Sequence, residues 1–543
     1  MNSAELLLRC LVNEGVEIIY GVPGEETLEL MNALLDSEIR FITCRHEQGA
    51  AFMADVQGRI TGRAGVCLST LGPGATNLMT GVADANMDHA PLVAITGQAG
   101  LDRLHKESHQ HIDLVSAFRP LTKWSTLVGL PRIIPEVVRK AFKVAQAEKP
   151  GATHLDFPED VAAMEAAGEP LPPEEPEPAQ PPENALRKAA KIIAEARAPL
   201  VLAGAGVGRC RCATALTEFA ERLNIPVANT FMGKGAIPHT SEQSLLTVGL
   251  QARDYVMAGF DRADVIIAVG YDVVEYSPAR WNPDSDKIIV HIDASSAEVD
   301  ASYGPAVEVV GDISTALQAL TEMVPPKDTC VVCHLRPIIL SELAEGSEDN
   351  GFPLKPQRII AELHRVFGEE DLLISDVGAH KLWIARMFPT MRPNTCIISN
   401  GLAAMGIALP GAIAAKLVRP YQRVVAACGD GGVLMNIQEL ETAVRLRTPF
   451  VTLVFNDGGY GVIAWKQILK FGRPAFVEFG NPDFVKLAES FGCAGYRVEA
   501  ADELGPILTE ALQQDVPAVI DCPVDYSENF RLTEKLGQIT VKV

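Results

Sequence analysis

The chain has 543 residues, too many for one hydrophobic core, and this length indicates several domains. With 48% hydrophobic residues, 21% charged residues and 44 glycines, it has the composition of a compact soluble enzyme rather than of a disordered or fibrous protein. The 69 acidic residues outnumber the 47 basic ones and give a net charge of −22. Such a surface repels phosphate backbones and anionic lipids, so we expect neither nucleic acid nor a membrane as a partner.

The N-terminal segment 1–24 contains no basic stretch followed by a small-residue cleavage site, and its pattern predicts a capped helix and then a short strand. The 11 cysteines are odd in number and scattered along the chain, which is typical of reduced thiols. Both features predict a cytoplasmic protein.

Two segments have patterns that point to other functions. The uncharged stretch Asn400–Ala415 is rich in Ala and Gly and interrupted by Pro410, so it predicts a closely packed internal helix rather than a membrane span. Cys330, Cys333 and His334 match the C-x-x-C-H pattern of covalent haem attachment. We do not expect haem, because the motif lies in an expected connection between domains and no signal peptide is recognised. We do not expect zinc either, because no second cysteine pair has the spacing of a zinc site.

Runs of β-branched residues alternate with amphipathic stretches along the chain, as in RVVAACGD and TPFVTLVFND. This alternation predicts an α/β fold of three domains, each with a mostly parallel sheet flanked by helices. The Pro- and Glu-rich segment 166–183 is expected to be a stiff linker. We expect domains at 1–165, 184–325 and 355–543, the last with a C-terminal tail, and a second connection at 326–354. The first and third domains are expected to be distant structural relatives.

The third domain carries the strongest chemical signal, because an apolar strand runs into the glycine-rich turn Gly429-Asp430-Gly431-Gly432 and then into a helical stretch. Such a turn lets backbone N–H groups approach a phosphate, and an acidic residue within it makes sense if it holds a bridging divalent metal. Asn456 and Gly458 close the next strand, 26 residues after Asp430. Adjacent parallel strands would bring the two side chains and the Gly458 carbonyl together, and these oxygens fit the octahedral shell of Mg²⁺. The sequence therefore predicts a magnesium site at Asp430, Asn456 and Gly458.

A G-D-G turn followed at 26 residues by Asn resembles the signature of thiamine-diphosphate enzymes, and the resemblance covers essentially the whole chain. Segments 21–24, 45–51 and 69–77 are similar to the pyrimidine-binding domain of the acetolactate synthase family. Segments 376–380 and 401–406 are similar to its diphosphate-binding domain, which leaves 184–325 as its central domain. The resemblance implies thiamine diphosphate and Mg²⁺ as cofactors.

The same resemblance implies an enzyme of the transferase class, an acetolactate synthase. Such an enzyme decarboxylates pyruvate and ligates the hydroxyethyl carbanion to a second pyruvate, which gives 2-acetolactate and CO₂. Another thiamine-diphosphate carboligase, or a 2-oxo acid decarboxylase, is the alternative. In the family the two half-sites come from different subunits, so we expect a homodimer or homotetramer with active sites at the subunit interface.

The resemblance also assigns roles to single residues. Glu47 is the catalytic carboxylate that faces the pyrimidine ring, although a Glu at a helix start beside Arg45 is by itself typical of a surface ion pair. Met405 is the apolar wedge that holds the cofactor bent, and Ala379 stands where the family commonly has glutamine, which leaves one diphosphate contact unassigned. The expected cofactor-binding residues are Pro23, Gly24, Glu47, Pro73, Asn77, Val377, Gly378, His380, Ala403, Met405, Gly429, Asp430, Gly431, Gly432, Asn456, Gly458, Tyr460 and Gly461.

Substrate contacts are less sharply indicated. Gln110 lies in a region that faces the reactive carbon in the family, and we expect it to orient substrate or an intermediate. His109 and His111 are equally well explained as polar loop residues. Lys123 and Arg386 are candidates to supply a positive charge for a pyruvate carboxylate, but the sequence does not decide between them.

The branch of the family is indicated by the central domain and by one position near the end of the chain. The Gly204–Gly208 loop lacks the full G-x-G-x-x-G spacing and indicates a structural turn rather than a dinucleotide site. Segment 270–278 resembles the flavin-independent catabolic branch, so FAD is not expected. Lys466 stands where the biosynthetic branch has a tryptophan that favours 2-ketobutyrate, which predicts pyruvate as both donor and acceptor.

Overall fold

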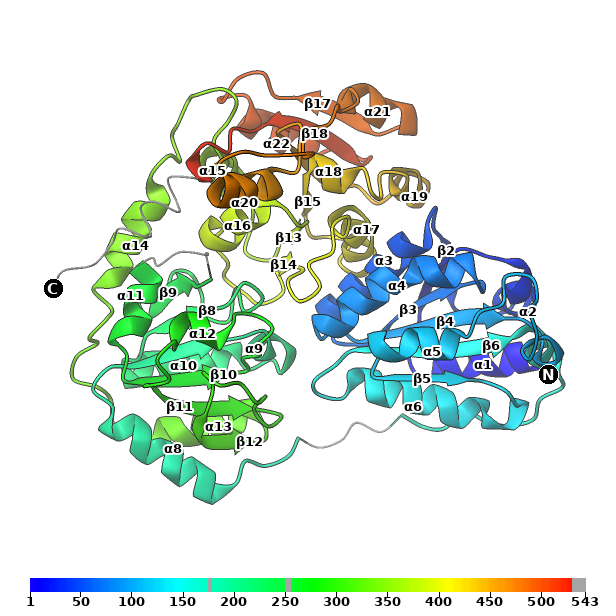
Figure 1. Ribbon diagram of the computed structural model, residues 1–543, viewed down its shortest axis with the longest axis horizontal. Coiled ribbons are helices and arrows are strands. Elements are labelled where there is room, and N and C mark those ends of the chain that lie inside the picture. The colour runs from blue at the N-terminus through cyan, green and yellow to red at the C-terminus, as the bar shows by residue number, and fades with distance from the viewer. Residues whose placement is uncertain (174–177, 250–254, 530–543) are drawn as a thin grey trace.

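The computed structural model describes residues 1–173, 178–249 and 255–529. These residues form three α/β units arranged in a triangle, each built on a six-stranded sheet whose strands all pair in parallel (Figure 1). The prediction of three mostly parallel α/β domains is confirmed. Part of the predicted linker and the C-terminal tail 530–543 lie outside the described residues.

The first unit has the strand order β2-β1-β3-β4-β6-β5. Its N-terminal segment is the predicted capped helix, because the Asn2 side chain and Glu5 form a capping box, and a strand follows. The strands are β1 Ile18–Gly21, β2 Arg40–Thr43, β3 Gly65–Ser69, β4 Leu92–Gln98, β5 Trp124–Leu127 and β6 Ala152–Pro158, and the helices are α1 Ser3–Asn13, α2 Leu28–Leu34, α3 Glu47–Thr61, α4 Pro73–Met87, α5 Leu114–Phe118, α6 Ile134–Gln146 and α7 Glu159–Ala163.

The second unit has the order β12-β11-β10-β7-β8-β9. The chain builds the sheet outward from β7 in one direction through β8 and β9 and in the other through β10, β11 and β12. Its strands are β7 Pro199–Ala203, β8 Val227–Asn229, β9 Ser244–Thr247, β10 Val265–Val269, β11 Ile288–Asp293 and β12 Pro305–Val310, and its helices are α8 Glu183–Glu195, α9 Gly206–Arg209, α10 Ala213–Leu223, α11 Tyr255–Arg262, α12 Pro278–Trp281 and α13 Ile313–Met323. The expected connection 326–354 contains a further helix, α14 Leu335–Ala344, which lies beside the second and third units (Figure 1).

The third unit has the order β14-β13-β15-β16-β18-β17, which repeats the order of the first unit strand for strand and supports their structural kinship. Its strands are β13 Leu372–Ser375, β14 Cys396–Ile398, β15 Val424–Gly429, β16 Val451–Asn456, β17 Ala494–Arg497 and β18 Ala518–Pro523, and its helices are α15 Pro356–Val366, α16 Ala379–Met387, α17 Ala408–Val418, α18 Asp430–Val433, α19 Glu439–Leu446, α20 Gly461–Phe471, α21 Phe484–Phe491 and α22 Leu504–Ala511.

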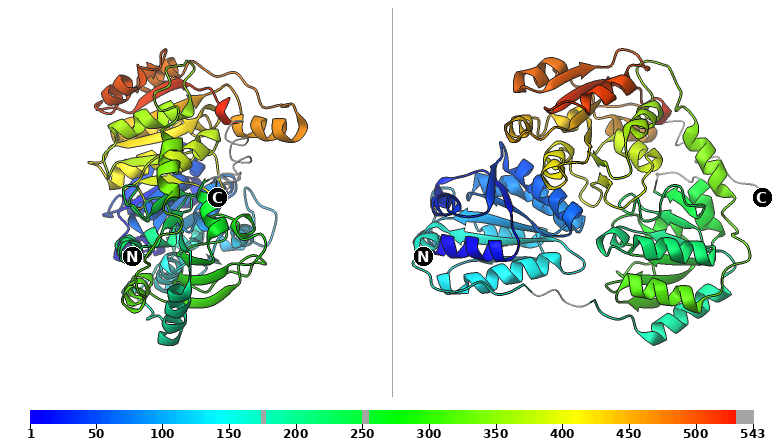
Figure 2. Two further views of the ribbon diagram at one scale, coloured as in Figure 1. Left: turned by 90° about the vertical axis from the view of Figure 1, so that its left-hand side faces the viewer. Right: turned by 180° about the vertical axis from the view of Figure 1, so that it is seen from behind.

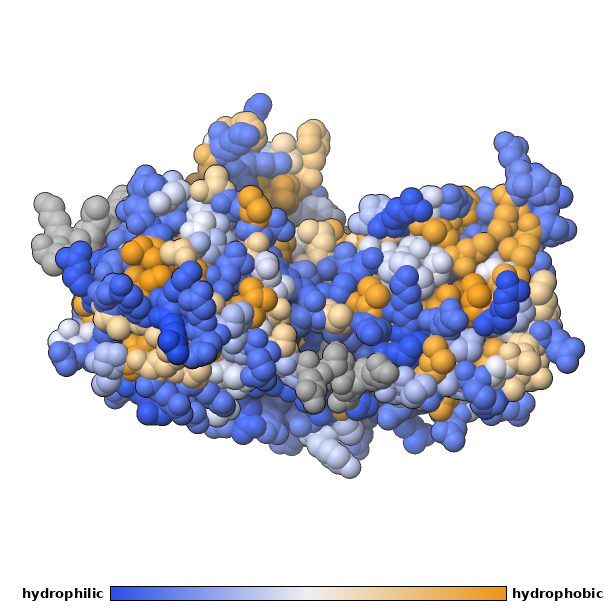
Figure 3. All heavy atoms as spheres, turned by 90° about the horizontal axis from the view of Figure 1, so that it is seen from below, coloured by the Kyte–Doolittle hydropathy of each residue, from blue (hydrophilic) through white to orange (hydrophobic). Residues whose placement is uncertain are grey.

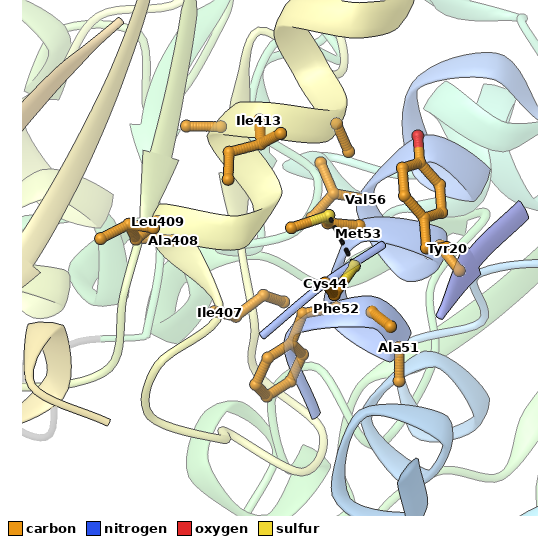
Figure 4. Close-up of a cluster of buried hydrophobic side chains, with 14 of the residues drawn as sticks. Tyr20, Cys44, Ala51, Phe52, Met53, Val56, Ile407, Ala408, Leu409 and Ile413 are labelled. Atoms are coloured by element: carbon orange, nitrogen blue, oxygen red, sulfur yellow. Dashed lines mark hydrogen bonds between the residues drawn. The ribbon is translucent and has the colours of Figure 1, made fainter. Parts of the chain in front are cut away.

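The first and third units share one hydrophobic core, formed where α3 packs on α17. Phe52, Met53 and Val56 of α3 face Ile407 and Ile413 from the α17 side (Figure 4). Ala- and Gly-rich faces allow this close approach, since a Cβ at Gly411 would lie 2.8 Å from Val56 Cγ2. The second half of the uncharged stretch, from Ala408, is therefore an internal helix as the sequence predicts, whereas residues 400–407 form a loop.

No helix among the described residues is long and apolar enough to cross a membrane. The face seen from below in Figure 3 is mostly hydrophilic, with smaller apolar patches between the charged side chains. The left view of Figure 2 shows that the helix α20, in orange, projects away from the body of the third unit.

Candidate functional site at the carboxyl ends of two sheets

The predicted metal ligands lie at the ends of neighbouring strands. β15 pairs with β16 in parallel, with Gly429 opposite Phe455, so Asp430 and Asn456 leave the same edge of the sheet. Nδ2 of Asn481 lies 2.8 Å from Oδ2 of Asp430 and 2.9 Å from Oδ1 of Asn456. These three side chains form one cluster. The sequence predicted Asp430 and Asn456 as members of it, but not Asn481.

The Gly458 backbone completes the surroundings of the Asp430 carboxylate. Its N–H donates to Oδ2 of Asp430 at 2.7 Å, and its carbonyl accepts from the N–H of Phe479 at 3.2 Å. The left-handed backbone at Gly458, with φ of 71°, makes this turn possible. Burial and the charge of Asp430 raise the pKa of the neighbouring Asp457 to about 7, which shows how unfavourable further negative charge is at this point.

His380 lies over the same edge of the sheet. A Cβ at Gly378 would lie 2.8 Å from its ring and one at Gly429 would lie 3.3 Å from it, so both glycines are needed for its position. The ring stacks on Phe455, with centroids 5.3 Å apart, and its Nε2 has no hydrogen-bond partner although it is buried. Burial lowers the pKa of His380 to about 3, so the imidazole is neutral and carries a single N–H.

These features fit a diphosphate bridged by a divalent cation. Buried polar atoms without partners cost free energy, and besides His380 Nε2 they include Oδ1 of Asn481 and Oδ2 of Asp376. A Cβ at Gly431 would lie 2.8 Å from the Tyr460 ring, so a larger residue in this turn would clash with that ring. Oxygen ligands from Asp430 and Asn456 suit a hard cation such as Mg²⁺.

The loop that carries Ala403 and Met405 is fastened by the first unit. Asp84 accepts from the hydroxyl of Ser399 at 2.7 Å and from the N–H of Ala404 at 3.2 Å, while Asp88 accepts from the N–H of Asn400 at 3.0 Å. Farther along, the N–H of Gly406 donates to Oδ1 of Asp376 at 2.8 Å. Met405 is half-buried in this loop, and Ala403 has a positive φ of 56°.

Glu47 is the first residue of α3 and is almost fully buried. Its Oε2 accepts from Nδ2 of Asn77 at 2.9 Å, and a Cβ at Gly74 would lie 3.3 Å from its Oε1. The alternative of a surface ion pair with Arg45 is therefore wrong, since the carboxylate instead meets the start of α4. The N-terminal end of α3 favours a negative charge at this position.

The other predicted residues of this half-site lie at the carboxyl ends of β1 and β3. Pro23 and Gly24 follow β1, and a Cβ at Gly24 would lie 2.4 Å from Cβ of Thr70, beyond β3. Pro73 opens α4 at the same edge. The edge of the first sheet therefore gathers Glu47, Asn77, Pro23, Gly24 and Pro73.

The start of α3 is held by the third unit. Oε1 of Glu439 accepts from the backbone N–H groups of Arg45 and His46, each at 3.0 Å, and its Oε2 accepts from the hydroxyl of Thr442 at 2.6 Å. Glu439 is fully buried, and the two residues whose backbone it binds directly precede Glu47 in the sequence. Glu439 could not be identified from the sequence, because its contacts are with backbone groups about 390 positions away.

Two predicted cationic residues lie elsewhere. Nζ of Lys123 donates to the carbonyls of Ala147 and Lys149 at 2.8 and 2.7 Å. Arg386 is buried against the second unit, where it donates to the Thr247 carbonyl at 3.1 Å. Neither geometry supports a pyruvate carboxylate site at these positions.

The glycine loop of the central unit is closed by its own chain. The N–H of Ala205 donates to both carboxylate oxygens of Glu275 at 3.0 Å, and a Cβ at Gly204 would lie 2.3 Å from the Gly270 carbonyl oxygen. This agrees with the prediction of a structural turn. Elsewhere, Cys330 and Cys333 form a disulfide directly before α14, so the expectation of reduced thiols is wrong for this pair and holds for the other nine cysteines.

Comparisons with known proteins agree with this arrangement. Sequence models of the thiamine pyrophosphate enzyme N-terminal TPP binding domain, central domain and C-terminal TPP binding domain match residues 1–117, 186–320 and 376–522. The acetolactate synthase of Bacillus subtilis (strain 168) is 37% identical over 98% of this chain and 94% of its own length. The catabolic acetolactate synthase of Raoultella terrigena is 38% identical over 99% of this chain and 97% of its own length. A probable acetolactate synthase large subunit of Methanocaldococcus jannaschii is 36% identical over 99% and 95%. The chain therefore belongs to the acetolactate synthase family of thiamine pyrophosphate enzymes.

Proposed function

We propose that this protein is an acetolactate synthase that uses pyruvate as both donor and acceptor, so that two pyruvates give one 2-acetolactate and one CO₂. The observation that carries the proposal is the cluster of Asp430, Asn456 and Asn481 at the ends of β15 and β16. It stands in a chain that matches acetolactate synthases over nearly its full length.

Magnesium and thiamine diphosphate would be held at this cluster. Asp430, Asn456 and the Gly458 carbonyl would bind Mg²⁺, and the buried, unpartnered Nε2 of His380 would face the diphosphate. The loop with Met405 would support the rings between the half-sites. When bound, thiamine diphosphate supplies the electron sink that decarboxylation requires.

The side chains of the first unit would hold and direct the proton that the reaction needs. The buried Glu47 carboxylate would share a proton with a ring nitrogen of the pyrimidine, and Asn77 would fix the direction of that carboxylate through its hydrogen bond to Oε2. Gln110 would orient the pyruvate acceptor.

A form without flavin is supported by the central unit. The carboxylate of Glu275 fills the place beside the Ala205 N–H where a phosphate of a dinucleotide would bind, and Gly206 packs against Gly270. A protein purified without added flavin should show no absorption band near 450 nm, roughly the flavin maximum. A stoichiometric yellow cofactor would contradict this part of the proposal.

A homodimer or homotetramer is supported by exposed apolar side chains next to the metal cluster. Among the described residues no hydrogen bond joins Glu47 to the Asp430 cluster, as expected if each half-site pairs with that of a second copy. α20 projects from the body with Ile463, Leu469 and Phe471 exposed (Figure 2), as expected of a surface that a second copy covers.

A cytoplasmic location stays a prediction.

The product formed from pyruvate alone tests the proposal. With thiamine diphosphate and Mg²⁺ present, 2-acetolactate and CO₂ should appear in equal amounts. Free acetaldehyde as the main product would identify a decarboxylase instead. A Glu47→Gln variant should bind thiamine diphosphate but turn over pyruvate at least about a hundredfold more slowly, since a neutral amide cannot exchange the proton.

A further inference from the structure

A chain of buried polar side chains lies beneath the loop that carries Gln110. It begins at Gln98, the last residue of β4, which is 2% exposed. The Nε2 of Gln98 donates to the carbonyl of Ile112 at 3.2 Å and to Oδ2 of Asp156 at 3.0 Å. Its Oε1 accepts from the next backbone N–H at 2.9 Å and from Nδ1 of His111 at 3.1 Å. Every donor and acceptor site of this amide is therefore used, and two of its contacts lie on the residues directly after Gln110.

The far end of this hydrogen-bond network is buried at Thr96, Asp156 and His154 and half-buried at Ser125. Oγ1 of Thr96 lies 2.8 Å from Oδ1 of Asp156 and 2.8 Å from Nε2 of His154, and the hydroxyl of Ser125 lies 2.9 Å from Nδ1 of His154. The ring of His154 stacks on Phe118, with centroids 4.0 Å apart. Burial lowers the pKa of His154 to about 3, so its imidazole is neutral and has one hydrogen to donate.

Because each hydroxyl and the neutral imidazole have a single polar hydrogen, the bonds in this part of the chain must all run in one direction. When Asp156 is protonated, it donates to Thr96, Thr96 donates to His154, and His154 donates to Ser125. When Asp156 is ionised, all three bonds reverse, and Ser125 then loses the hydrogen bond in which its hydroxyl donates to the Val115 carbonyl at 3.2 Å. Oδ2 of Asp156 accepts from Gln98 in both cases, so the contact with Gln98 is kept.

The loop needs such support. Gln110 has a positive φ of 56°, its side chain is exposed, and a Cβ at Gly72 would lie 2.7 Å from its carbonyl oxygen. Gly72 directly precedes α4, where Asn77 and Gly74 meet the Glu47 carboxylate. The Gln110 loop and Glu47 therefore lie at one edge of the first sheet, with the Gln98–Asp156 pair beneath the loop.

We propose that Gln98 and Asp156 are positioning residues for carboligation, because their hydrogen bonds fix the backbone of loop 109–112 and thereby the direction of the Gln110 side chain. This inference rests on the proposed function, from which Gln110 takes its role. An exposed side chain on an unsupported loop loses effectiveness steeply, since a displacement of about 1 Å can cost about a hundredfold in rate.

The test compares Gln98→Ala and Asp156→Ala with two variants that keep the support. Asp156→Asn reproduces the protonated acid, because its oxygen accepts from Gln98 and its amide donates to Thr96. Ser125→Ala is the matched control, since it removes the hydrogen bond between Ser125 and His154 at the far end of the same network of side chains. Amide hydrogen exchange at loop 109–112 is measured by mass spectrometry in the protein without cofactor. It should rise at least about tenfold in Gln98→Ala and Asp156→Ala and stay near the wild-type rate in the other two.

Turnover gives the second readout. The two alanine variants should shift the product from acetolactate toward acetaldehyde and raise the KM for pyruvate at least about tenfold, while their affinity for thiamine diphosphate changes less than about threefold. A purely structural role would lower stability without changing the ratio of products. Unchanged loop exchange in Gln98→Ala and Asp156→Ala, or an unchanged product ratio in variants with a loosened loop, would overturn the inference.

The two proposals fail in different ways. If the wild-type protein forms no acetolactate from pyruvate, the proposed function fails, but the exchange experiment still decides whether Gln98 and Asp156 hold the loop. If the wild type forms acetolactate and the variants do so equally well, only the positioning inference fails.

Discussion

The amide of Asn481 bridges Asp430 and Asn456, with its Nδ2 at 2.8 Å from one and 2.9 Å from the other. Its Oδ1 is buried without a partner. Asn481 therefore holds together two side chains that the strands β15 and β16 bring only to the same edge.

We expect Asn481→Ala to weaken the binding of Mg²⁺ by about ten- to a hundredfold, the usual cost of removing a group that orients metal ligands. The measurement is a titration of thiamine diphosphate binding against Mg²⁺ concentration by calorimetry. Asn32→Ala, on the exposed face of α2, serves as the control. Equal Mg²⁺ dependence in both variants would exclude this role of Asn481.

Glu439 fixes the start of α3 from another unit of the fold, because it accepts the N–H groups of Arg45 and His46. Glu439→Ala should lower kcat for pyruvate by at least about tenfold, since the Glu47 carboxylate loses its fixed position, and Glu439→Gln should retain more activity because its amide oxygen still accepts. Steady-state kinetics of the two variants checks this order. The reverse order, with the glutamine variant less active, would show that the charge rather than the contact matters.

Arg59 forms ion pairs with three buried carboxylates, with distances of 2.6 Å to Asp55, 2.9 Å to Asp84 and 2.8 Å to Asp88. Its removal in Arg59→Ala leaves these charges buried without a cation, which costs about 3–5 kcal/mol in comparable sites. Urea unfolding measures the loss, with the exposed Arg63→Ala as control. Similar unfolding midpoints for the two variants would show that the carboxylates find other compensation.

Asp156 should make stability depend on pH. Burial raises its pKa to about 7, above the usual value near 3.8, so the folded state holds its proton more tightly than the unfolded chain. This contribution is fully present below about pH 4 and is lost as pH rises to about 7, by about 4 kcal/mol at most. Relative to the wild type, Asp156→Asn should therefore gain stability between pH 5 and pH 8, roughly the range that spans this titration. Unfolding curves at both pH values with a constant difference between the two proteins would contradict the shift.

The disulfide of Cys330 and Cys333 should be reduced and alkylated in the folded protein before any other cysteine reacts. Both residues are partly exposed, whereas eight of the nine free cysteines are buried and Cys210 is intermediate. Burial raises the pKa of the Cys210 thiol, which makes it a poor nucleophile. Treatment of the folded protein with a dithiol, followed by alkylation and mass spectrometry, should label Cys330 and Cys333 before any other cysteine. Labelling of buried cysteines at the same rate would indicate that the fold opens first.

The sequence alone was sufficient for the features that depend on local pattern. Alternating apolar runs and glycine-rich turns predicted three parallel α/β units, and the interval between Asp430 and Asn456 predicted neighbouring strand ends, because one helix between two adjacent parallel strands returns the chain to the same edge. The Ala- and Gly-rich composition around Pro410 likewise predicted a closely packed internal helix at α17.

Other parts of the site depend on contacts between residues far apart in the chain. Asn481, Glu439 and Gln98 lie in segments whose local sequence is ordinary, and they act through side-chain and backbone atoms that only folding brings within hydrogen-bond distance. The positions of Lys123 and Arg386 show the converse, since a cation suggests an anion site in sequence but is already bonded to backbone carbonyls in the fold. Local periodicity determines which elements form, whereas the packing of the three sheets decides which polar groups meet and which are left to bind a ligand.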